Sequence, residues 1–393
     1  MKIALISHLF PTELHPFHGK FIKDQLELLQ TDSNIQVELI VPTPYSLPFT
    51  ERNRKNNSIL ITKAKASRLK YLSFPEKRFP RIIARSISNT ITNFIDRSEA
   101  DVIHIHWLYP DGLVIPALKE MGLKTVLTIH GSDWYQTRND PVLVDLLESS
   151  LTTADRILYS GPLLKDDIEA EYPFLSSKSE IIYNLVDDGN YHPVDDEKKS
   201  VLKKGLGWDP SKKHALTVAN LRKEKGIDIL LEAISSTEDF SDIQFHVIGA
   251  DDKTDYSKKI RHQIQNTSQA DIELMEPVKP HELLKLYQAS DLYILPSRRE
   301  GFNVSILEAM ACGLPAVCTD VGGNKLIISD KTGLICPPKN ANLLAQGIRS
   351  LASALNQFNS THIHNTIASL YGNKAFLQKL KSIYASLYTD SSR

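Results

Sequence analysis

The chain has 393 residues, a length that suits two domains of ordinary size, each with a buried core. Lys and Arg number 46 against 47 Asp and Glu, and this balance excludes a protein that coats nucleic acid through overall positive charge. The 3 cysteines form no CxxC pair, which excludes a disulfide scaffold and a cysteine-rich zinc site. We expect a cytoplasmic protein, because the first apolar run is too short for a signal peptide and none is long enough to span a membrane.

Short apolar runs alternate with longer helical patterns through the first half of the chain. Helices are predicted at 20–30, 80–95 and 113–120, and strands at 3–7, 37–41, 102–105, 125–129, 156–160 and 180–183. The strands are continuously apolar, which is typical of a parallel sheet covered by helices on both faces. A first doubly wound domain is therefore predicted over residues 1–185.

The same alternation resumes after a polar, turn-rich stretch at 184–211, which we interpret as a linker. Strands are predicted at 215–219, 243–249, 272–275, 292–295 and 316–319, with helices at 228–234, 255–265, 281–289 and 305–312. They predict a second doubly wound domain over 186–371. An amphipathic helix at about 365–387 follows, and we expect the C-terminal helix, about 372–393, to pack back on the first domain. The predicted fold class is α/β, with two Rossmann-like domains facing across a cleft.

Three common nucleotide and nucleophile motifs do not occur. The first predicted strand is not followed by GxGxxG, which disfavours a dinucleotide site. GxxxxGK[ST] and GxSxG are missing as well, so a P-loop and a hydrolase nucleophile are not expected. Asp251 and Asp252 follow a predicted strand, and we interpret them as the start of a solvated loop rather than a metal site. His104 and His106 are interpreted as structural, because two imidazoles without a third ligand do not suggest zinc.

The most informative stretch is LPSRREGFNVSILEAMACGLPAVCTDVGG, at residues 295–323. A predicted strand ends at Pro296, a loop carries Glu300 and Gly301, and a helix begins near Val304. Glycine lets a ligand approach the backbone, and the N–H groups of a first helical turn can donate to hydroxyls or phosphate. Glu300 and Glu308 can accept hydrogen bonds from hydroxyls. The alternative is a loop charge followed by small residues that pack a helix on a sheet.

This stretch resembles the signature of the retaining GT-B glycosyltransferases of family 4, the glycosyl transferases group 1. Glu300 and Glu308 stand at the spacing of the family's two acidic residues, and EGF, LEAMACG and the later GG fall in order. The resemblance covers nearly the whole chain and is strongest to bacterial teichuronic-acid and exopolysaccharide-type enzymes. It implies a GT-B fold and metal-independent, cofactor-free transfer, with retention, of a hexose-type sugar. The donor would be a UDP- or GDP-linked sugar, and the acceptor an oligosaccharide or a polyprenyl-diphosphate-linked glycan in cell-surface polysaccharide synthesis.

The resemblance also implies roles for individual residues. In the family, Glu300 would bind the sugar, Glu308 the ribose, and Lys225 the diphosphate. Arg222 is a second candidate cation, with a solvated surface charge as the alternative, while Asn220 stands where the family usually has Arg. His130 matches a sugar-contacting histidine, with a packed or capping histidine as the alternative. The expected catalytic residues are His130, Arg222, Lys225 and Glu300, and the expected donor-binding residues are Gly19, Asn220, Met275, Val278, Gly301, Phe302, Asn303, Val304, Ser305 and Glu308.

Two of these residues represent wider regions. Gly19 resembles the family's glycine loop after the first strand, whose backbone amides approach the donor phosphate. The region from Met275 to Val278 is expected to bind the base, and both uracil and guanine stay open. We expect no metal site.

Two other functions stay open on the sequence. A protein that binds a sugar nucleotide or glycan without turnover would keep the fold, and a nucleotide-sugar epimerase would form product without an acceptor. Residues 52–89 contain eleven Lys or Arg and a single acid, Glu76, so they carry +10. They are interpreted either as a solvated face or as a surface that meets anionic lipid or a polyprenyl diphosphate at the inner face of the cytoplasmic membrane.

Overall fold

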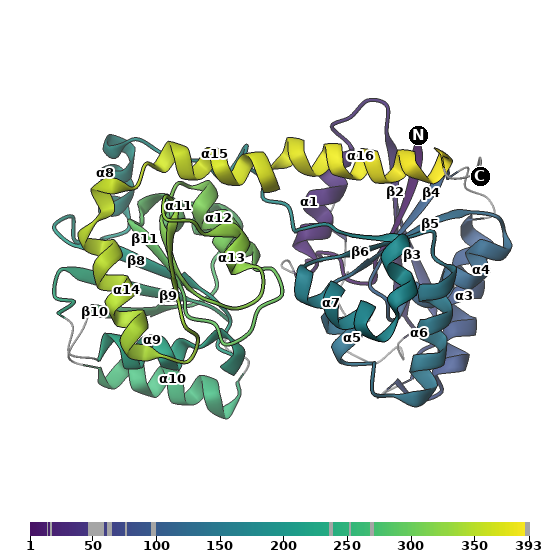
Figure 1. Ribbon diagram of the computed structural model, residues 1–393, viewed down its shortest axis with the longest axis horizontal. Coiled ribbons are helices and arrows are strands. Elements are labelled where there is room, and N and C mark those ends of the chain that lie inside the picture. Colours follow the sequence, from purple (N-terminus) through teal and green to yellow (C-terminus); the bar gives the residue numbers. More distant parts are fainter. Residues whose placement is uncertain are drawn as a thin grey trace. The chain divides into compact units, whose positions relative to one another are not determined.

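The chain folds into two compact units, each with its own sheet. A computed structural model describes residues 1–13, 15, 18–45, 59–60, 65–74, 77–95, 100–235, 239–250, 253–267 and 271–389. Unit 1 contains Met1–Leu185 and Phe376–Arg393, and unit 2 contains Val186–Ala375. Helices flank both sheets (Figure 1), so each unit has the doubly wound architecture predicted from its continuous apolar strands.

Unit 1 is built on a seven-stranded parallel sheet in the order β3-β2-β1-β4-β5-β6-β7. Its strands are β1 (Lys2–Ile6), β2 (Gln36–Pro44), β3 (Lys65–Tyr71), β4 (Val102–His106), β5 (Lys124–Ile129), β6 (Arg156–Tyr159) and β7 (Ser179–Ile181). The order reverses between β1 and β4. In sheets of this type, ligands bind at such a switch point, beyond the carboxyl ends of the strands.

Helices cover both faces of this sheet, so alternate side chains of one strand enter different cores. In β1, Ala4 and Ile6 join one core, while Ile3 and Leu5 lie on the opposite face. The first core is closed by α3 (Pro80–Ile95), the 3₁₀ helix η2 (Asp111–Val114), α4 (Ile115–Glu120), α6 (Pro141–Thr153) and α7 (Pro162–Glu171). The opposite face is covered by α1 (Lys20–Leu29) and by α16 (Asn373–Thr389) at the end of the chain. The short elements α5 (Ser132–Tyr135) and η3 (Pro173–Ser177) complete the unit.

Unit 2 contains a six-stranded parallel sheet in the order β10-β9-β8-β11-β12-β13. Its strands are β8 (Lys213–Val218), β9 (Ile243–Ile248), β10 (Asp271–Met275), β11 (Leu292–Leu295), β12 (Ala316–Thr319) and β13 (Gly333–Cys336). Its helices are α8 (Asp196–Gly205), η4 (Lys223–Lys225), α9 (Ile227–Ile234), α10 (Asp255–Asn266), α11 (Pro280–Ala289), α12 (Val304–Ala311), α13 (Asn324–Ile327), α14 (Ala341–Ser353), η5 (Leu355–Gln357) and α15 (Ser360–Tyr371). Here the switch point lies between β8 and β11.

Two predictions about helices are wrong in part. The stretch predicted as a linker contains α8, a helix with no buried residue. It is stabilised at its ends, because the Asp195 carboxylate accepts from the Lys198 N–H. Two acids in the first turn and two lysines in the last turn lie at the favourable ends of the helix dipole. The single C-terminal helix is two helices, α15 and α16. Extended backbone at Gly372 separates them, and the Asn373 N–H donates to Asp188 Oδ1 at 2.8 Å.

The last helix, α16, packs against unit 1 from Phe376 onward. Its apolar stripe of Leu380, Ile383, Tyr384 and Leu387 is at most 3% exposed. Lys379 and Lys381 add ion pairs at its surface, with Glu180 and Asp32. Among the described residues, no helix is both long and apolar enough to cross a membrane.

Candidate active site

In unit 2, the loop between β11 and α12 holds the carboxylate of Glu300 in a buried position. Glu300 is 9% exposed, and its Oε1 accepts hydrogen bonds from Ser297 Oγ at 2.6 Å and Asn303 Nδ2 at 3.0 Å. Asn303 is also the N-cap of α12, because its Oδ1 accepts from the Ser305 N–H at 2.8 Å. The start of the helix and the orientation of the carboxylate are therefore fixed by one side chain.

Lys225 joins this loop from the other side of the switch point. Its Nζ lies 2.8 Å from both Oε1 and Oε2 of Glu300. Gly226, the next residue, has a left-handed φ of 68°, and a Cβ there would lie 2.0 Å from the Pro296 carbonyl oxygen. The loop after β8 and the loop after β11 thus contact each other directly, and an ion pair joins them.

A second ion pair holds the same two loops together. The Arg298 guanidinium donates to both oxygens of Asp228, each at 2.6 Å, and to the Lys223 carbonyl at 2.9 Å. The Tyr256 hydroxyl also donates to Asp228, at 2.8 Å. Burial raises the pKa of Asp228, but the hydrogen bonds from Arg298 and Tyr256 outweigh it and leave the pKa below its ordinary value. The carboxylate therefore stays ionised and keeps the loops in register.

Glu308 lies in α12, eight residues after Glu300, and is 7% exposed. The Tyr287 hydroxyl donates to its Oε2 at 3.1 Å, and burial together with the Glu308 charge raises the pKa of Tyr287 well above 10. Tyr287 therefore remains a donor. Close to the start of α12, the hydroxyls of Ser305 and Tyr293 are 2.6 Å apart, and Ser305 Oγ donates to the Val218 carbonyl.

The glycines near Glu300 differ in what they touch. Gly322 and Gly323 lie against the loop, where added Cβ atoms would come within 2.6 Å of the Glu300 carbonyl oxygen and the Phe302 ring. Gly301 has no heavy atom within 4 Å of an added Cβ, and its φ is not in the left-handed region. Neither packing nor backbone conformation requires glycine at 301, so the position is open toward whatever approaches the loop.

The remaining predicted residues of unit 2 are dispersed. Asn220 and Arg222 are exposed on the loop after β8 that also carries Lys225. Phe302 packs on Tyr371, with ring centroids 5.3 Å apart, so it supports the loop from behind. Met275 ends β10, two strands from β8 in the sheet order, and Val278 follows it. The structure thus brings Lys225, Glu300, Asn303 and Ser305 together and places Met275 and Val278 further along the same sheet edge.

In unit 1, His130 lies directly after β5, within an aromatic cluster. Its ring centroid lies 4.4 Å from that of Trp107 and 4.8 Å from that of Phe21. Its Nε2 lies 3.0 Å from Nδ1 of His106. Burial lowers the pKa of His130 to about 3, and the nearby imidazoles of His104 and His8 contribute to a smaller extent. The ring is therefore neutral at pH 7. In His130, Nε2 is engaged with His106. The second ring nitrogen, Nδ1, is the one that a ligand could contact.

Asp133 fixes the backbone that carries His130. Its carboxylate accepts from the N–H groups of Leu108 at 2.6 Å, Gly131 at 2.8 Å and His130 at 3.2 Å. Burial raises the pKa of Asp133 to about 6, although these three N–H groups favour the ionised form. The carboxylate thereby ties the loop after β5 to the loop after β4.

His8 and Asp111 belong to none of the sequence motifs, but the structure places them at the switch point of unit 1. His8 follows β1, and its Nδ1 lies 2.9 Å from Oδ2 of the fully buried Asp111. The same oxygen accepts from the His8 N–H at 2.7 Å. The His104 side chain, by contrast, is internal: its Nδ1 lies 2.7 Å from the Tyr384 hydroxyl of α16, and its Nε2 lies 2.8 Å from Thr128 Oγ1.

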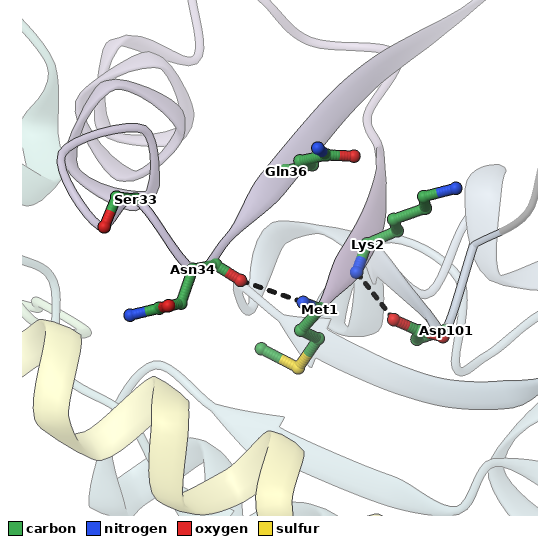
Figure 2. A pocket seen from close by; sticks show the side chains of 6 residues that line it. All are labelled: Met1, Lys2, Ser33, Asn34, Gln36 and Asp101. Carbon is green, nitrogen blue, oxygen red and sulfur yellow. Dashed lines mark hydrogen bonds between the residues drawn. The ribbon is translucent and has the colours of Figure 1, made fainter.

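A hollow in unit 1 lies at the amino ends of the strands. It has a volume of ≈ 400 Å³ and is lined by Met1, Lys2, Ser33, Asn34, Gln36 and Asp101. Figure 2 shows that its polar groups bind one another, with the amino terminus on the Asn34 carbonyl at 2.8 Å and the Lys2 N–H on Asp101 at 2.7 Å. These residues precede or begin strands, so the hollow lies away from the carboxyl ends where parallel sheets bind ligands.

Within the described ranges, no group of three or more His, Cys, Asp or Glu side chains is arranged to hold a metal ion. Asp251 and Asp252 lie outside the described residues.

Two family profiles match the chain, one in each unit. The sequence profile described as glycosyl transferases group 1 matches residues 198–359, and the profile described as glycosyltransferase family 4 matches residues 23–190. The chain belongs to glycosyltransferase family 4. The predicted family is thereby confirmed, and so is glycosyltransferase activity at this level.

Relatives of this glycosyltransferase are distant in sequence but match most of the chain. A putative teichuronic acid biosynthesis glycosyltransferase of Bacillus subtilis is 26% identical over 88% of both chains. The N-acetyl-α-D-glucosaminyl L-malate synthase of Bacillus anthracis is 24% identical and covers 78% of this chain and 79% of its own.

Solved structures confirm the predicted GT-B fold. Sucrose-phosphate synthase of Thermosynechococcus elongatus matches 99% of this glycosyltransferase and 100% of its own chain, with a TM-score of 0.77 and 19% identity. The Anabaena protein HepE, crystallised with UDP and glucose, matches 98% of this chain and 100% of its own, with a TM-score of 0.73 and 16% identity.

Proposed function

We propose that this protein is a retaining, metal-independent glycosyltransferase that moves a hexose-type sugar from a nucleotide-sugar to a lipid-linked or oligosaccharide acceptor in cell-surface polysaccharide synthesis. The observation that carries the proposal is the buried Glu300 carboxylate bound to Lys225 at the switch point of unit 2. Sequence similarity to the putative teichuronic acid biosynthesis glycosyltransferase of Bacillus subtilis supports the polysaccharide role.

The donor's diphosphate is assigned to Lys225 and Arg222. A nucleoside diphosphate gains negative charge as its bond to the sugar breaks, and fixed cations beside it lower that barrier. Lys225 is well suited, because its ammonium lies between a buried carboxylate and the solvent and is held 2.8 Å from Glu300. The N–H groups at the start of α12 add donors. Positive charge from the protein takes the place that a divalent metal holds in other transferases.

The sugar and the ribose are assigned to the two glutamates. Glu300 accepts hydrogen bonds from sugar hydroxyls, while open space at Gly301 lets the sugar approach the backbone. Glu308 accepts from the ribose, with Tyr287 keeping its second oxygen oriented. Phe302, Asn303, Val304 and Ser305 are assigned to the donor together with Asn220 on the loop after β8. Gly19 is assigned to the donor phosphate, and Met275 and Val278 are assigned to the base. UDP is favoured over GDP by the UDP complexes of HepE.

His130 is assigned to the transferred sugar. It is neutral and half-buried, and the rings of Trp107 and Phe21 lie beside it. A polar imidazole next to apolar aromatic rings suits a pyranose, which has both hydroxyls and apolar C–H faces. Retention of configuration requires that the new bond forms on the face from which the diphosphate leaves.

A donor screen with a Glu300 variant tests this proposal. Radiolabelled UDP- and GDP-hexoses are incubated with the protein and with polyprenyl-diphosphate-linked sugars or oligosaccharides. Glu300→Gln removes charge from a buried, hydrogen-bonded carboxylate, and we expect kcat to fall by about 100-fold or more. Glu197→Gln, which changes an exposed glutamate in α8, is the matched control and should keep full activity.

The other two functions predict different results in the same screen. A binding protein without turnover would show tight nucleotide binding and no labelled product with any donor. An epimerase would convert the nucleotide-sugar when no acceptor is present. Either result would contradict the proposed transferase.

We further propose that unit 1 attaches peripherally to the inner face of the cytoplasmic membrane. Phe79 is 59% exposed and Ile82 47% exposed, and both adjoin basic side chains at the start of α3. Arg81 and Arg85 lie in the first two turns, where positive charge opposes the helix dipole, so they do not serve helix stability. Exposed apolar groups beside cations suit an anionic lipid surface. Residues 52–58, 61–64 and 75–76 of the same basic region lie outside the described residues.

Vesicle co-sedimentation tests the attachment. Binding should rise with the fraction of anionic lipid and fall with salt, and the double variant Arg81→Glu, Arg85→Glu should weaken it by about tenfold or more, at roughly 1 kcal/mol per basic residue. Binding that does not depend on anionic lipid would remove the proposal.

A further inference from the structure

The two oxygens of the Glu300 carboxylate differ in their partners. Oε1 accepts three hydrogen bonds, from Ser297 Oγ at 2.6 Å, Asn303 Nδ2 at 3.0 Å and Lys225 Nζ at 2.8 Å. Within the described part of the chain, Oε2 accepts from Lys225 alone, at 2.8 Å. A carboxylate has about two acceptor sites on each oxygen. Oε1 is therefore saturated, and Oε2 keeps a site for one more donor.

Ser297 contributes to this difference through a hydroxyl that does nothing else. Ser297 is 0% exposed, and Glu300 Oε1 is the only hydrogen-bond acceptor that its hydroxyl contacts among the described residues. A buried hydroxyl costs free energy unless it is hydrogen-bonded, and alanine would fill nearly the same space without that cost. A hydrogen bond to a charged acceptor is stronger than one between neutral groups. The hydroxyl therefore serves to orient the Glu300 carboxylate.

The backbone of Ser297 is itself fixed by the next strand of the sheet. Thr319, the last residue of β12, donates through Oγ1 to the Ser297 carbonyl at 2.6 Å. Asn324 Nδ2 in turn donates to the Thr319 carbonyl at 2.9 Å. Both side chains belong to residues that are 1% exposed. This series of buried hydrogen bonds holds Ser297 in place, so its hydroxyl meets the carboxylate from one direction.

Lys225 differs from the other two donors in its exposure. Its side chain is 25% exposed, whereas Asn303 is 9% exposed and Ser297 is fully buried. Ser297 and Asn303 thus hold Oε1 from the interior, and Lys225 is the partner that a ligand can reach. A diphosphate beside Lys225 and a sugar hydroxyl at the remaining site of Oε2 can therefore be bound by the same ion pair.

We propose that Ser297 is a positioning residue for the donor sugar. Together with Asn303 it occupies Oε1, so Glu300 accepts a sugar hydroxyl through Oε2 alone and recognises one hydroxyl of the donor. The last torsion of a glutamate side chain has broad minima, so without the Ser297 hydroxyl the carboxylate can turn and present either oxygen. This inference rests on the proposed transferase function and on the assignment of the sugar to Glu300.

A second buried serine beside the same strand provides a matched control. Ser290 precedes β11, at the amino end of the sheet, whereas Ser297 follows β11 at the carboxyl end. Ser290 is also 0% exposed, and its hydroxyl donates to the Leu286 carbonyl at 2.7 Å. Ser297→Ala and Ser290→Ala therefore remove the same group from equally buried positions, and only the first touches Glu300. Ser297→Cys keeps a side chain of similar size whose thiol donates weakly, so the interior stays filled.

Transfer from the radiolabelled UDP-hexose that reacts fastest, and calorimetric titration of UDP, give the two measurements. We expect Ser297→Ala to lower kcat/KM for the donor by about tenfold or more, because the bond it removes is to a charged acceptor. Ser297→Cys should lower it less. The affinity for UDP should stay within about threefold of that of the unaltered protein in both variants, since UDP carries no sugar for Glu300 to bind. Ser290→Ala should change neither quantity.

Donors that lack a single hydroxyl test whether Oε2 recognises one hydroxyl. UDP-hexoses without the 2-, 3-, 4- or 6-hydroxyl are each compared in the unaltered protein and in Ser297→Ala. For one of these donors the substitution should change kcat/KM by less than about threefold, because the hydroxyl that Oε2 accepts is already missing. The other donors should keep the loss of about tenfold or more.

The possible outcomes separate this inference from the function on which it rests. Transfer by the unaltered protein, with the same kcat/KM in Ser297→Ala and Ser290→Ala, would overturn the role of Ser297 alone. An affinity for UDP that falls as far as kcat/KM in Ser297→Ala would also contradict it, because the serine would then support the whole loop. Equal losses with every deoxy donor would overturn the recognition of one hydroxyl. No transfer by the unaltered protein with any donor would overturn the proposed function and this inference with it.

Discussion

Buried neutral histidines are the residues whose titration most affects stability. Burial lowers the pKa of His104 and of His246 to about 3, from an ordinary value of 6.5. Between these values the unfolded chain binds protons that the folded chain does not, so folding stability falls as the pH drops from about 6.5 toward 3. Asp133 acts in the opposite direction, since its raised pKa of about 6 favours the folded state as the pH falls toward 3.8.

We therefore expect the thermal unfolding midpoint to fall by several degrees or more between pH 7.5 and pH 4.5. His246→Gln should reduce the fall of the midpoint with pH, because it removes an imidazole that takes up a proton in the unfolded chain but not in the folded chain. His262→Gln changes an exposed histidine and should leave the slope as it is. A midpoint that stays constant or rises over this interval would contradict the account.

At the scale of single residues, the sequence predicts the motif but not the partners. The spacing of Glu300 and Glu308 is local, so it can be seen directly in the chain. The contact of Lys225 with Glu300 joins residues 75 apart, and the contact of His8 with Asp111 joins residues 103 apart. Neither follows from spacing, because both depend on which strands are neighbours in the sheet.

At the scale of elements, two loops form the site of unit 2, and Arg298 holds them. Arg298→Lys keeps the charge but cannot donate to both oxygens of Asp228 and to the Lys223 carbonyl at once. We expect a loss of about 1–3 kcal/mol in stability, and an affinity for UDP weaker by about tenfold, because the loop that carries Lys225 loosens.

Arg349→Lys supplies the matched comparison in the same unit. Arg349 also binds an aspartate through two nitrogens, at 2.6 and 3.0 Å from Asp242. Its loss should cost comparable stability and leave UDP affinity unchanged, since it contacts neither loop. Equal effects of the two substitutions on UDP affinity, measured by calorimetry, would show that the Arg298 pair has no special role in positioning the site.

Helices and strands with a regular apolar pattern could be predicted from the sequence, and several without such a pattern could not. The helix at 80–95 was predicted with its observed bounds, because its buried isoleucines recur every four residues. The strands β3 and β13 were missed. Both lie at an edge of their sheet, where β3 is polar, KASRLKY, and β13 begins with a glycine. The helices α6, α7 and α14 were also missed, although Asp140 before Pro141 is a clear start signal for α6.

For the whole molecule, the near-zero net charge conceals an uneven distribution. The described basic residues of the 52–89 region lie on unit 1, on and beside β3 and α3. Unit 2 carries the buried Glu300 and the partly buried Asp228, both paired with cations at its switch point. Unit 1 is completed by the C-terminal helix α16, whose apolar face is buried against residues from the other end of the chain. The amphipathic pattern of α16 predicts that it is buried. The break at Gly372 is accompanied by a hydrogen bond from the Asn373 N–H to Asp188, which no local pattern shows.

The central claim is that Lys225, beside Glu300, provides the charge for a donor diphosphate. Calorimetric titration of UDP into the unaltered protein and into Lys225→Met tests it most directly, with Lys212→Met, a partly exposed lysine of the same unit, as the control. We predict that UDP binds the unaltered and Lys212→Met proteins with equal affinity and binds Lys225→Met about tenfold or more weakly. Equal affinity of all three proteins for UDP would contradict the claim.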